Sequence, residues 1–174
     1  MVIRKRLPIE GKALVFVTAT VTDWIPVFGN HTAAEIAIDE LSKATDYFSV
    51  AVVGYVLMPS HMHFLLGFSQ IGQLSKFMQS FKILSSKAVK QSVNSVIIGG
   101  LWHDGTFNLW KPRFDDLIIV SEEQFRTKLN YIHNNPVKAG LVSDPCEWPN
   151  SSASDWLKDR KGPLRVDKNF RWME

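Results

Sequence analysis

The sequence has very little cysteine: Cys146 is the single one in a chain of 174 residues. One cysteine cannot form an intramolecular disulfide, and the absence of a Cys-x-x-Cys pair excludes the usual structural zinc site. Long apolar runs are absent too, since the longest, residues 50–58, has the length of a strand and not the ~20 residues of a membrane span. The apolar stretch behind the basic N-terminus is too short for the core of an export signal. We therefore expect a cytoplasmic protein in a reducing compartment, with no membrane as partner.

A strong excess of charge of one sign is also missing. The chain has 20 Lys and Arg against 17 Asp and Glu, a net charge of +3, which permits a polyanionic partner without requiring one. With 45% hydrophobic and 11% aromatic residues the chain can bury a core, which excludes a disordered or fibrous protein. At this length we expect one domain, residues 1–157, followed by a basic C-terminal tail, residues 158–174.

Four segments have the pattern of strands. Residues 13–22 are rich in β-branched side chains and alternate as a half-buried strand does, with Val15, Val17, Ala19 and Val21 on one face. Residues 50–58 and 61–67 flank a turn at Pro59-Ser60, and the pattern of residues 115–120 predicts the last strand. Between the last two strands, residues 94–114 form a mixed loop, which we expect to contact a ligand.

Three segments have the pattern of helices. The first begins at a cap on Thr32, the second begins at Leu74, and the third begins at a capping box of Ser121 and Gln124 and ends at Pro136. The resulting order, strand, helix, strand, strand, helix, strand, helix, predicts an α+β ferredoxin-like sandwich, an antiparallel sheet with helices on one face.

Two pairs of polar residues stand at spacings that can carry chemistry. His61 and His63 are two apart on a strand, so their imidazoles project from one face and can share a metal ion. A lone pair of this kind is weak evidence, because histidines also serve in cores. Tyr131 and Asn135 are four apart on the third helix and lie on one side of it. The plainer alternatives are a tyrosine that anchors a helix end, an ordinary asparagine before proline, and, for His133, a surface residue at a helix C-terminus.

Two longer motifs contain these pairs: YVLMPSHMHFLLGF at 55–68 and YIHNNPVKAGLV at 131–142. Together they resemble the HUH-type single-tyrosine transposases of small insertion sequences, and most closely their domesticated relatives, the REP-associated tyrosine transposases. The resemblance extends from Gly11 to Trp156 and includes MQSFK at 78–82, LWKPRFDDLII at 109–119 and SSASDW at 151–156. Residues 158–174 lie outside it.

The resemblance implies an enzyme that nicks and joins single-stranded or hairpin DNA, with repetitive extragenic palindromes as its partner DNA. It implies that Tyr131 attacks the strand and stays attached to the 5′ phosphate. It also implies that His61, His63 and Asn135 bind a divalent cofactor, Mg²⁺ or Mn²⁺, with asparagine as third ligand as in the REP-associated branch. Insertion-sequence relatives exchange tyrosine helices between two subunits, whereas REP-associated ones act as monomers, so monomer and homodimer both stay open.

Further residues are candidates for contacts with DNA. The candidates of the basic and aromatic type are Lys76, Lys82, Lys87, Lys111, Arg113, Trp110 and His133, with Trp102 and Phe107 as additional stacking platforms. The alternative is that the lysines are simply solvated and that the aromatic rings belong to the core.

Two other functions compete with the nicking enzyme. One is a domesticated protein that binds DNA hairpins without cutting them, which an intact set of His61, His63, Tyr131 and Asn135 disfavours. The other is a zinc hydrolase built on the two histidines. The second alternative is disfavoured because Leu65 stands where a His-x-His-x-Asp pattern needs aspartate, and because the chain is too short for a barrel of ~250 residues.

Overall fold

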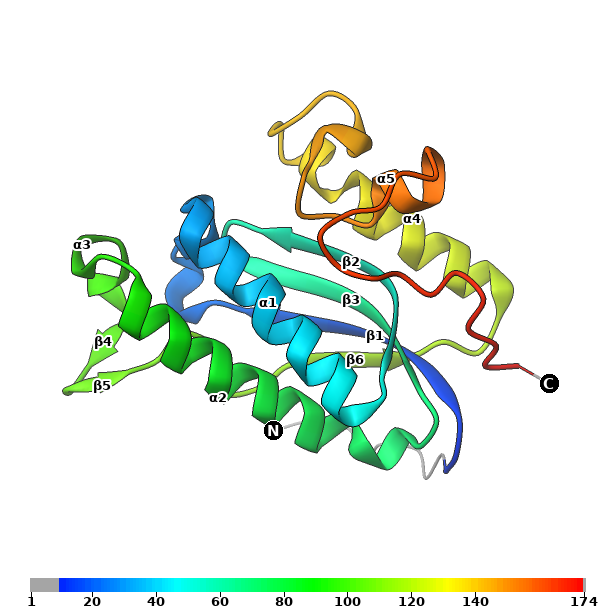
Figure 1. Ribbon diagram of the computed structural model, residues 1–174, viewed down its shortest axis with the longest axis horizontal. Coiled ribbons are helices and arrows are strands. Elements are labelled where there is room, and N and C mark those ends of the chain that lie inside the picture. The colour runs from blue at the N-terminus through cyan, green and yellow to red at the C-terminus, as the bar shows by residue number, and fades with distance from the viewer. Residues whose placement is uncertain (1–9, 174) are drawn as a thin grey trace.

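The computed structural model describes residues 10–173 and contains one central antiparallel sheet (Figure 1). Its strands lie in the order β2-β3-β1-β6, and every neighbouring pair is antiparallel. Their bounds are β1 Ala13–Thr20, β2 Ala51–Met58, β3 His61–Phe68 and β6 Asp115–Ile118. Element order and sheet order confirm the predicted ferredoxin-like α+β class.

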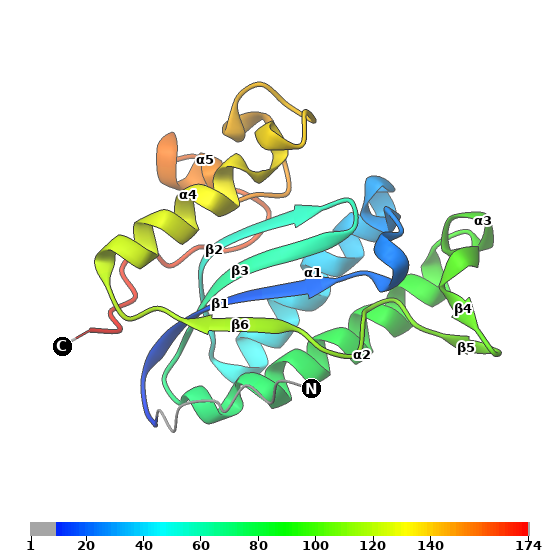
Figure 2. The ribbon, with the colours of Figure 1, turned by 180° about the vertical axis from the view of Figure 1, so that it is seen from behind.

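The helices cover both faces of this sheet, so the prediction of helices on one face is incomplete (Figures 1 and 2). Helices α1, His31–Phe48, and α2, Leu74–Ser92, pack on the face that buries Val15 and Phe64. Helix α4, Glu122–Lys138, packs on the opposite face. That face is apolar as well, since it buries Leu14 and Phe16 of β1, Val53 and Val56 of β2 and Leu65 of β3, and an apolar face needs its own cover.

Helix α4 lies unusually close to β2, because Gly54 has no side chain at the crossing. A Cβ atom on Gly54 would stand 2.8 Å from Leu129 Cδ1. The helix begins as predicted, with the Ser121 hydroxyl accepting a hydrogen bond from Gln124 N at 3.1 Å. Its predicted end was wrong: Pro136 lies inside the helix, which continues to Lys138. The start of α1 was also wrong, since Asn30 caps it by accepting from Ala33 N.

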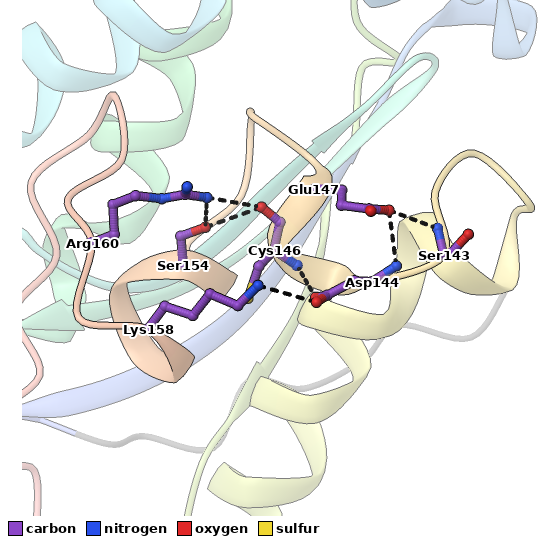
Figure 3. A network of polar contacts seen from close by, with 7 residues as sticks. All are labelled: Ser143, Asp144, Cys146, Glu147, Ser154, Lys158 and Arg160. Atoms are coloured by element: carbon purple, nitrogen blue, oxygen red, sulfur yellow. Dashed lines mark hydrogen bonds and ion pairs between the residues drawn. The ribbon is translucent and has the colours of Figure 1, made fainter.

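Residues after α4 fold back along the sheet and are tied together by polar contacts (Figure 3). They include a short 3-10 helix, Pro145–Glu147, and helix α5, Ala153–Leu157. In this network Asp144 caps the turn through Cys146 N at 2.7 Å, and the guanidinium of Arg160 donates to the Cys146 carbonyl at 3.2 Å. These bonds hold the chain in place between α4 and the C-terminal segment.

The described part of the predicted tail, residues 158–173, packs against the domain. Leu164 is 2% exposed, and Asp167 N donates to the Val52 carbonyl at 2.7 Å, which extends the edge of β2. Phe170 lies directly on Gly67, where a Cβ atom would stand 2.6 Å from the ring. This basic segment therefore contributes to the core as well as to the surface.

The loop of residues 94–114 contains small elements of its own. They are α3 Ser95–Ile98, a 3-10 turn at Gly99–Leu101, and the two-stranded hairpin of β4, Trp102–His103, and β5, Thr106–Phe107. Three further 3-10 turns lie at Thr22–Trp24, Val27–Gly29 and Ile71–Gln73. Across residues 10–173, no helix combines the length and the apolar character that crossing a bilayer demands.

Candidate active site

The two histidines of β3 project from the sheet face that α4 covers. Alternation along the strand places His61 and His63 on one side and buries Met62 on the other. Their ring centroids are 4.8 Å apart. Thr18 stands opposite His63 in the β1–β3 register, and its hydroxyl lies 2.8 Å from His63 Nδ1. This hydrogen bond fixes the ring so that its other nitrogen, Nε2, faces away from the sheet.

Helix α4 brings Tyr131 and Asn135 to these histidines. The Tyr131 hydroxyl lies 3.4 Å from His63 Nε2, and the two ring centroids are 5.1 Å apart. Asn135 forms a side-chain hydrogen bond with His61. Phe16 stacks on His63 at 5.4 Å and meets Tyr131 edge-on at 6.0 Å, so it holds both rings. Four residues from two distant segments thus converge.

Burial keeps both imidazoles uncharged. It lowers the pKa of His63 to about 3, an effect to which the neighbouring His61 and Lys128 add. It also lowers the pKa of His61, and the hydrogen bond with Asn135 offsets part of this. A neutral imidazole has a lone pair available for a proton or a metal ion. At physiological pH the site is therefore a pair of neutral nitrogen donors.

Positive charge surrounds the tyrosine. Lys128 Nζ lies 4.6 Å from the centroid of Phe16 and 5.7 Å from that of Tyr131, and Lys138 Nζ lies 5.8 Å from Tyr131. The tyrosine itself is 38% exposed, so a large substrate can reach its hydroxyl. Two cations flanking an accessible hydroxyl make a suitable setting for a phosphate group.

The chemistry of the donors fits the expected metal ion. Two neutral imidazoles and the amide oxygen of Asn135 offer an N/O set that leaves room for water and phosphate oxygens, which suits Mg²⁺ or Mn²⁺. Within residues 10–173, no group of three or more His, Cys, Asp or Glu side chains is placed to hold a metal ion. Beside the two histidines, Asn135 is the side chain that could supply a third donor.

Two of the expected DNA contacts are wrong, because the side chains are buried. Trp110 is 5% exposed, packs on Phe28 and Phe81, and donates its indole N–H to the Ser85 hydroxyl at 2.9 Å. His133 is 3% exposed and lies on the inner side of α4. Its Nε2 lies 2.9 Å from the hydroxyl of Ser152, in the segment after α4. Neither side chain is presented to a ligand.

The basic residues that were expected to contact DNA lie in two separate parts of the molecule. Lys76, Lys82 and Lys87 lie on α2, on the face of the sheet opposite α4, and so away from Tyr131. Lys82 is also engaged, because its ammonium donates to the carbonyls of Lys111 and Pro112, and its pKa is lowered by burial. Lys111 itself lies near the histidines, and Arg113 is exposed two residues further on.

One residue that lies beside the site, Trp24, was not predicted from the sequence. Trp24 is 55% exposed, and its ring stands 5.6 Å from that of His61, edge to face. Lys111 Nζ lies 4.9 Å from its centroid. Only its position after the first strand was visible in the sequence, and nothing there linked it to the histidines across the turn.

Comparisons with known proteins agree with this geometry. The profile of the family described as "Transposase IS200 like" matches residues 20–135. A REP-associated tyrosine transposase of Escherichia coli (strain K12) is 30% identical over 98 residues, which are 56% of this chain and 51% of that protein. The chain spans about half the length of this curated relative.

Two solved structures have a similar fold, one over the whole chain and one over part of it. The structure of a REP-associated tyrosine transposase bound to a REP hairpin has a TM-score of 0.74 and 21% identity, and covers 100% of this chain and 98% of that one. A candidate transposase from Deinococcus radiodurans R1 has a TM-score of 0.53 and 21% identity, over 76% of this chain and 97% of that one. At these identities the likeness shows a shared fold.

Proposed function

Because this chain belongs to the IS200-like transposase family, we propose that it cuts and rejoins single strands of DNA, with Tyr131 as the attacking residue. One observation carries the proposal. The Tyr131 hydroxyl, on α4, lies 3.4 Å from Nε2 of His63, on β3, while the neighbouring Asn135 reaches His61. A purely structural tyrosine has no need of two uncharged histidines and an amide beside an exposed hydroxyl.

The attack exchanges one phosphate ester for another. The Tyr131 hydroxyl gives up its proton as its oxygen forms a bond to phosphorus. The bond from phosphorus to the 3′ oxygen breaks, and that oxygen takes up one proton in exchange and leaves as a free hydroxyl. The 5′ phosphate remains on the protein, so the bond energy is conserved and a 3′ hydroxyl can reverse the step. Lys128 and Lys138 provide positive charge for the phosphate.

His61, His63 and Asn135 are the residues that would hold the divalent ion. A bound Mg²⁺ or Mn²⁺ would polarise the phosphate and so favour attack by tyrosine, which is ordinarily protonated at neutral pH. The protein prepares for this by keeping both imidazoles neutral and by holding the His63 ring through Thr18. Phe16 restricts the movement of Tyr131 toward or away from them.

The proposed substrate is hairpin DNA with a single-stranded flank, of the kind formed by repetitive extragenic palindromes. Two similar proteins support this choice by name, the REP-associated tyrosine transposase of E. coli and the solved transposase that is bound to a REP hairpin. The lysines of α2 could meet the hairpin at a distance from the cut, since Lys76 and Lys82 line an open groove with Phe114. An unpaired flank suits a site that must reach one strand.

The test is a covalent adduct. Hairpin oligonucleotides taken from the DNA beside the protein's own gene are incubated with Mn²⁺, and products are separated by denaturing electrophoresis and mass spectrometry. We expect the wild type to gain the mass of the 5′-attached fragment, and Tyr131→Phe to give neither adduct nor nick. Tyr47→Phe is the matched control, because Tyr47 is 83% exposed at the far end of α1.

Two outcomes would contradict the proposal. A Tyr131→Phe protein that still nicks would show that water, and not tyrosine, attacks the strand. A wild type that binds the hairpin tightly and forms no adduct under any of these conditions would favour the alternative, a hairpin-binding protein without cleavage.

A further inference from the structure

We propose that Trp24 is a stacking platform for one unpaired base of the DNA strand, next to the linkage that Tyr131 attacks. This inference rests on the proposed function for the identity of the strand. It assigns to Trp24 a role in holding the substrate that is separate from the chemistry of the histidines and the tyrosine.

The backbone of Trp24 is the first observation. Asp23 and Trp24 have φ angles of +53° and +58°, in the left-handed region that is unfavourable for residues with a Cβ atom and especially for bulky ones. Such strain persists where surrounding structure enforces it, and it is concentrated at functional sites. The indole gives little packing in return, because 55% of the side chain is exposed.

The surroundings of the strained turn hold it in place. The Asp23 carboxylate pairs with His103 Nε2 at 3.4 Å, so the turn is tied to the β4–β5 hairpin. Val21 forms a bridge with Trp110, and Lys111 N donates to the Thr20 carbonyl at 2.8 Å. The ring of Trp24 is therefore presented to solvent by a braced loop.

The position of the ring is the second observation. Successive ring-to-ring distances of 5.6, 4.8 and 5.1 Å lead from Trp24 through His61 and His63 to Tyr131. A DNA strand that follows this row from a phosphate at Tyr131 brings one of its first unpaired bases to Trp24. An indole face binds any base by stacking, without reading its sequence.

The charge beside the ring is the third observation. Lys111 Nζ lies 4.9 Å from the Trp24 centroid, and 55% of this tryptophan is exposed to solvent. An aromatic ring with an adjacent lysine matches a nucleotide, since the ring accepts the base and the ammonium attracts its phosphate. The exposed Trp102 on the neighbouring hairpin repeats this pairing, with Lys90 Nζ at 4.6 Å.

The experiment scans the flank with a fluorescent base. Hairpin oligonucleotides from the DNA beside the protein's own gene carry 2-aminopurine at each flank position in turn, and binding is measured with Tyr131→Phe protein so that the strand stays intact. We expect quenching at one or two adjacent positions. Adding Trp24→Ala should remove this quenching and weaken binding roughly 5- to 150-fold, the usual effect of losing one stacked base.

Two more variants separate binding from stability. Trp24→Phe should retain part of the quenching, and Tyr47→Ala, which removes another exposed aromatic ring, should retain all of it. Trp24→Gly relieves the positive φ, so we expect its melting temperature to be equal to or above that of the wild type while its binding is weak. A lower melting temperature with unchanged binding would assign Trp24 a structural role and overturn the inference.

The outcomes also distinguish this inference from the proposed function. If the wild type forms its covalent adduct and Trp24→Ala binds and quenches as before, only the platform is refuted. If Trp24-dependent quenching occurs and no adduct forms, the platform stands and cleavage is refuted. A protein that binds no hairpin oligonucleotide refutes both.

Discussion

Replacing Thr18 with valine should weaken the binding of Mn²⁺ at the candidate site. The Thr18 hydroxyl lies 2.8 Å from His63 Nδ1, and valine has the same shape without the oxygen. An imidazole that binds a metal through Nε2 carries its proton on Nδ1 and needs an acceptor there. Loss of such a partner typically lowers metal affinity by roughly 10- to 100-fold, or about 1.4 to 2.7 kcal/mol.

The same substitution should lower stability, because the Nδ1–H of a histidine that is 5% exposed would be left without a partner. An unsatisfied buried donor costs about 1–3 kcal/mol. In a chain of this length each kcal/mol corresponds to roughly 2–4 °C in melting temperature. The expected loss is therefore several degrees, which remains measurable alongside the change in affinity.

The assay is the electron paramagnetic resonance signal of free Mn²⁺, titrated into the protein with and without hairpin DNA. Thr18→Ser keeps the hydroxyl and should restore most of the affinity that Thr18→Val loses. Equal Mn²⁺ uptake by Thr18→Val and wild type would refute the idea that Thr18 orients His63, and uptake by neither would refute the ligand set.

Three further outcomes follow from the described contacts. EDTA or His63→Ala should abolish nicking while hairpin binding, measured by gel shift, weakens far less, since the phosphate contacts come from lysines. His133 has a pKa lowered by burial to about 4, so the unfolded chain takes up a proton that the native state does not as the pH falls from about 6.5 to 4. His133 alone should lower the free energy of unfolding in urea over that window by up to about 3 kcal/mol, in addition to the share of the buried His61 and His63, so the fall should be smaller by about that amount in His133→Gln. Leu164→Ala, at a residue 2% exposed, should lower the free energy of unfolding by about 2–4 kcal/mol, whereas a loosely attached C-terminal segment would leave it unchanged.

The candidate site was predictable from the sequence where local periodicity decides geometry. Side chains two residues apart on a strand lie on the same face, so the sequence alone predicted that His61 and His63 are neighbours. Side chains four residues apart on a helix lie on the same side, which predicted that Tyr131 and Asn135 are neighbours. That the two pairs lie together was predicted only from the resemblance to the family. Helix α4 reaches the sheet through packing over Gly54, and no local sequence pattern specifies that packing.

The predictions that were wrong also depended on features that local sequence patterns do not specify. In a sequence, a tryptophan that stacks on DNA cannot be distinguished from one that fills a core. Trp110 is buried, and its backbone forms a bridge with Val21, a residue far away in the sequence. His133 is two residues from Tyr131 and therefore lies on a different side of α4, where it is buried. Pro136 stays helical because its position in the last turn costs few backbone hydrogen bonds. Trp24 needs a positive φ, which sequence signals predict for glycine and asparagine only.

Helix α4 folds back onto the sheet that contains β3, so the two histidines and the tyrosine belong to the same chain. Under the proposed function, a molecule arranged in this way would hold one nucleophile and would be joined to one DNA end at a time. Mixing His63→Ala with Tyr131→Phe protein should restore nothing, and in a mixture with wild type the activity should fall in direct proportion to the intact fraction and not to its square. A transfer between two DNA sites would accordingly be ordered in time, by successive encounters of a single protein molecule, and not in space, by two tyrosines acting together.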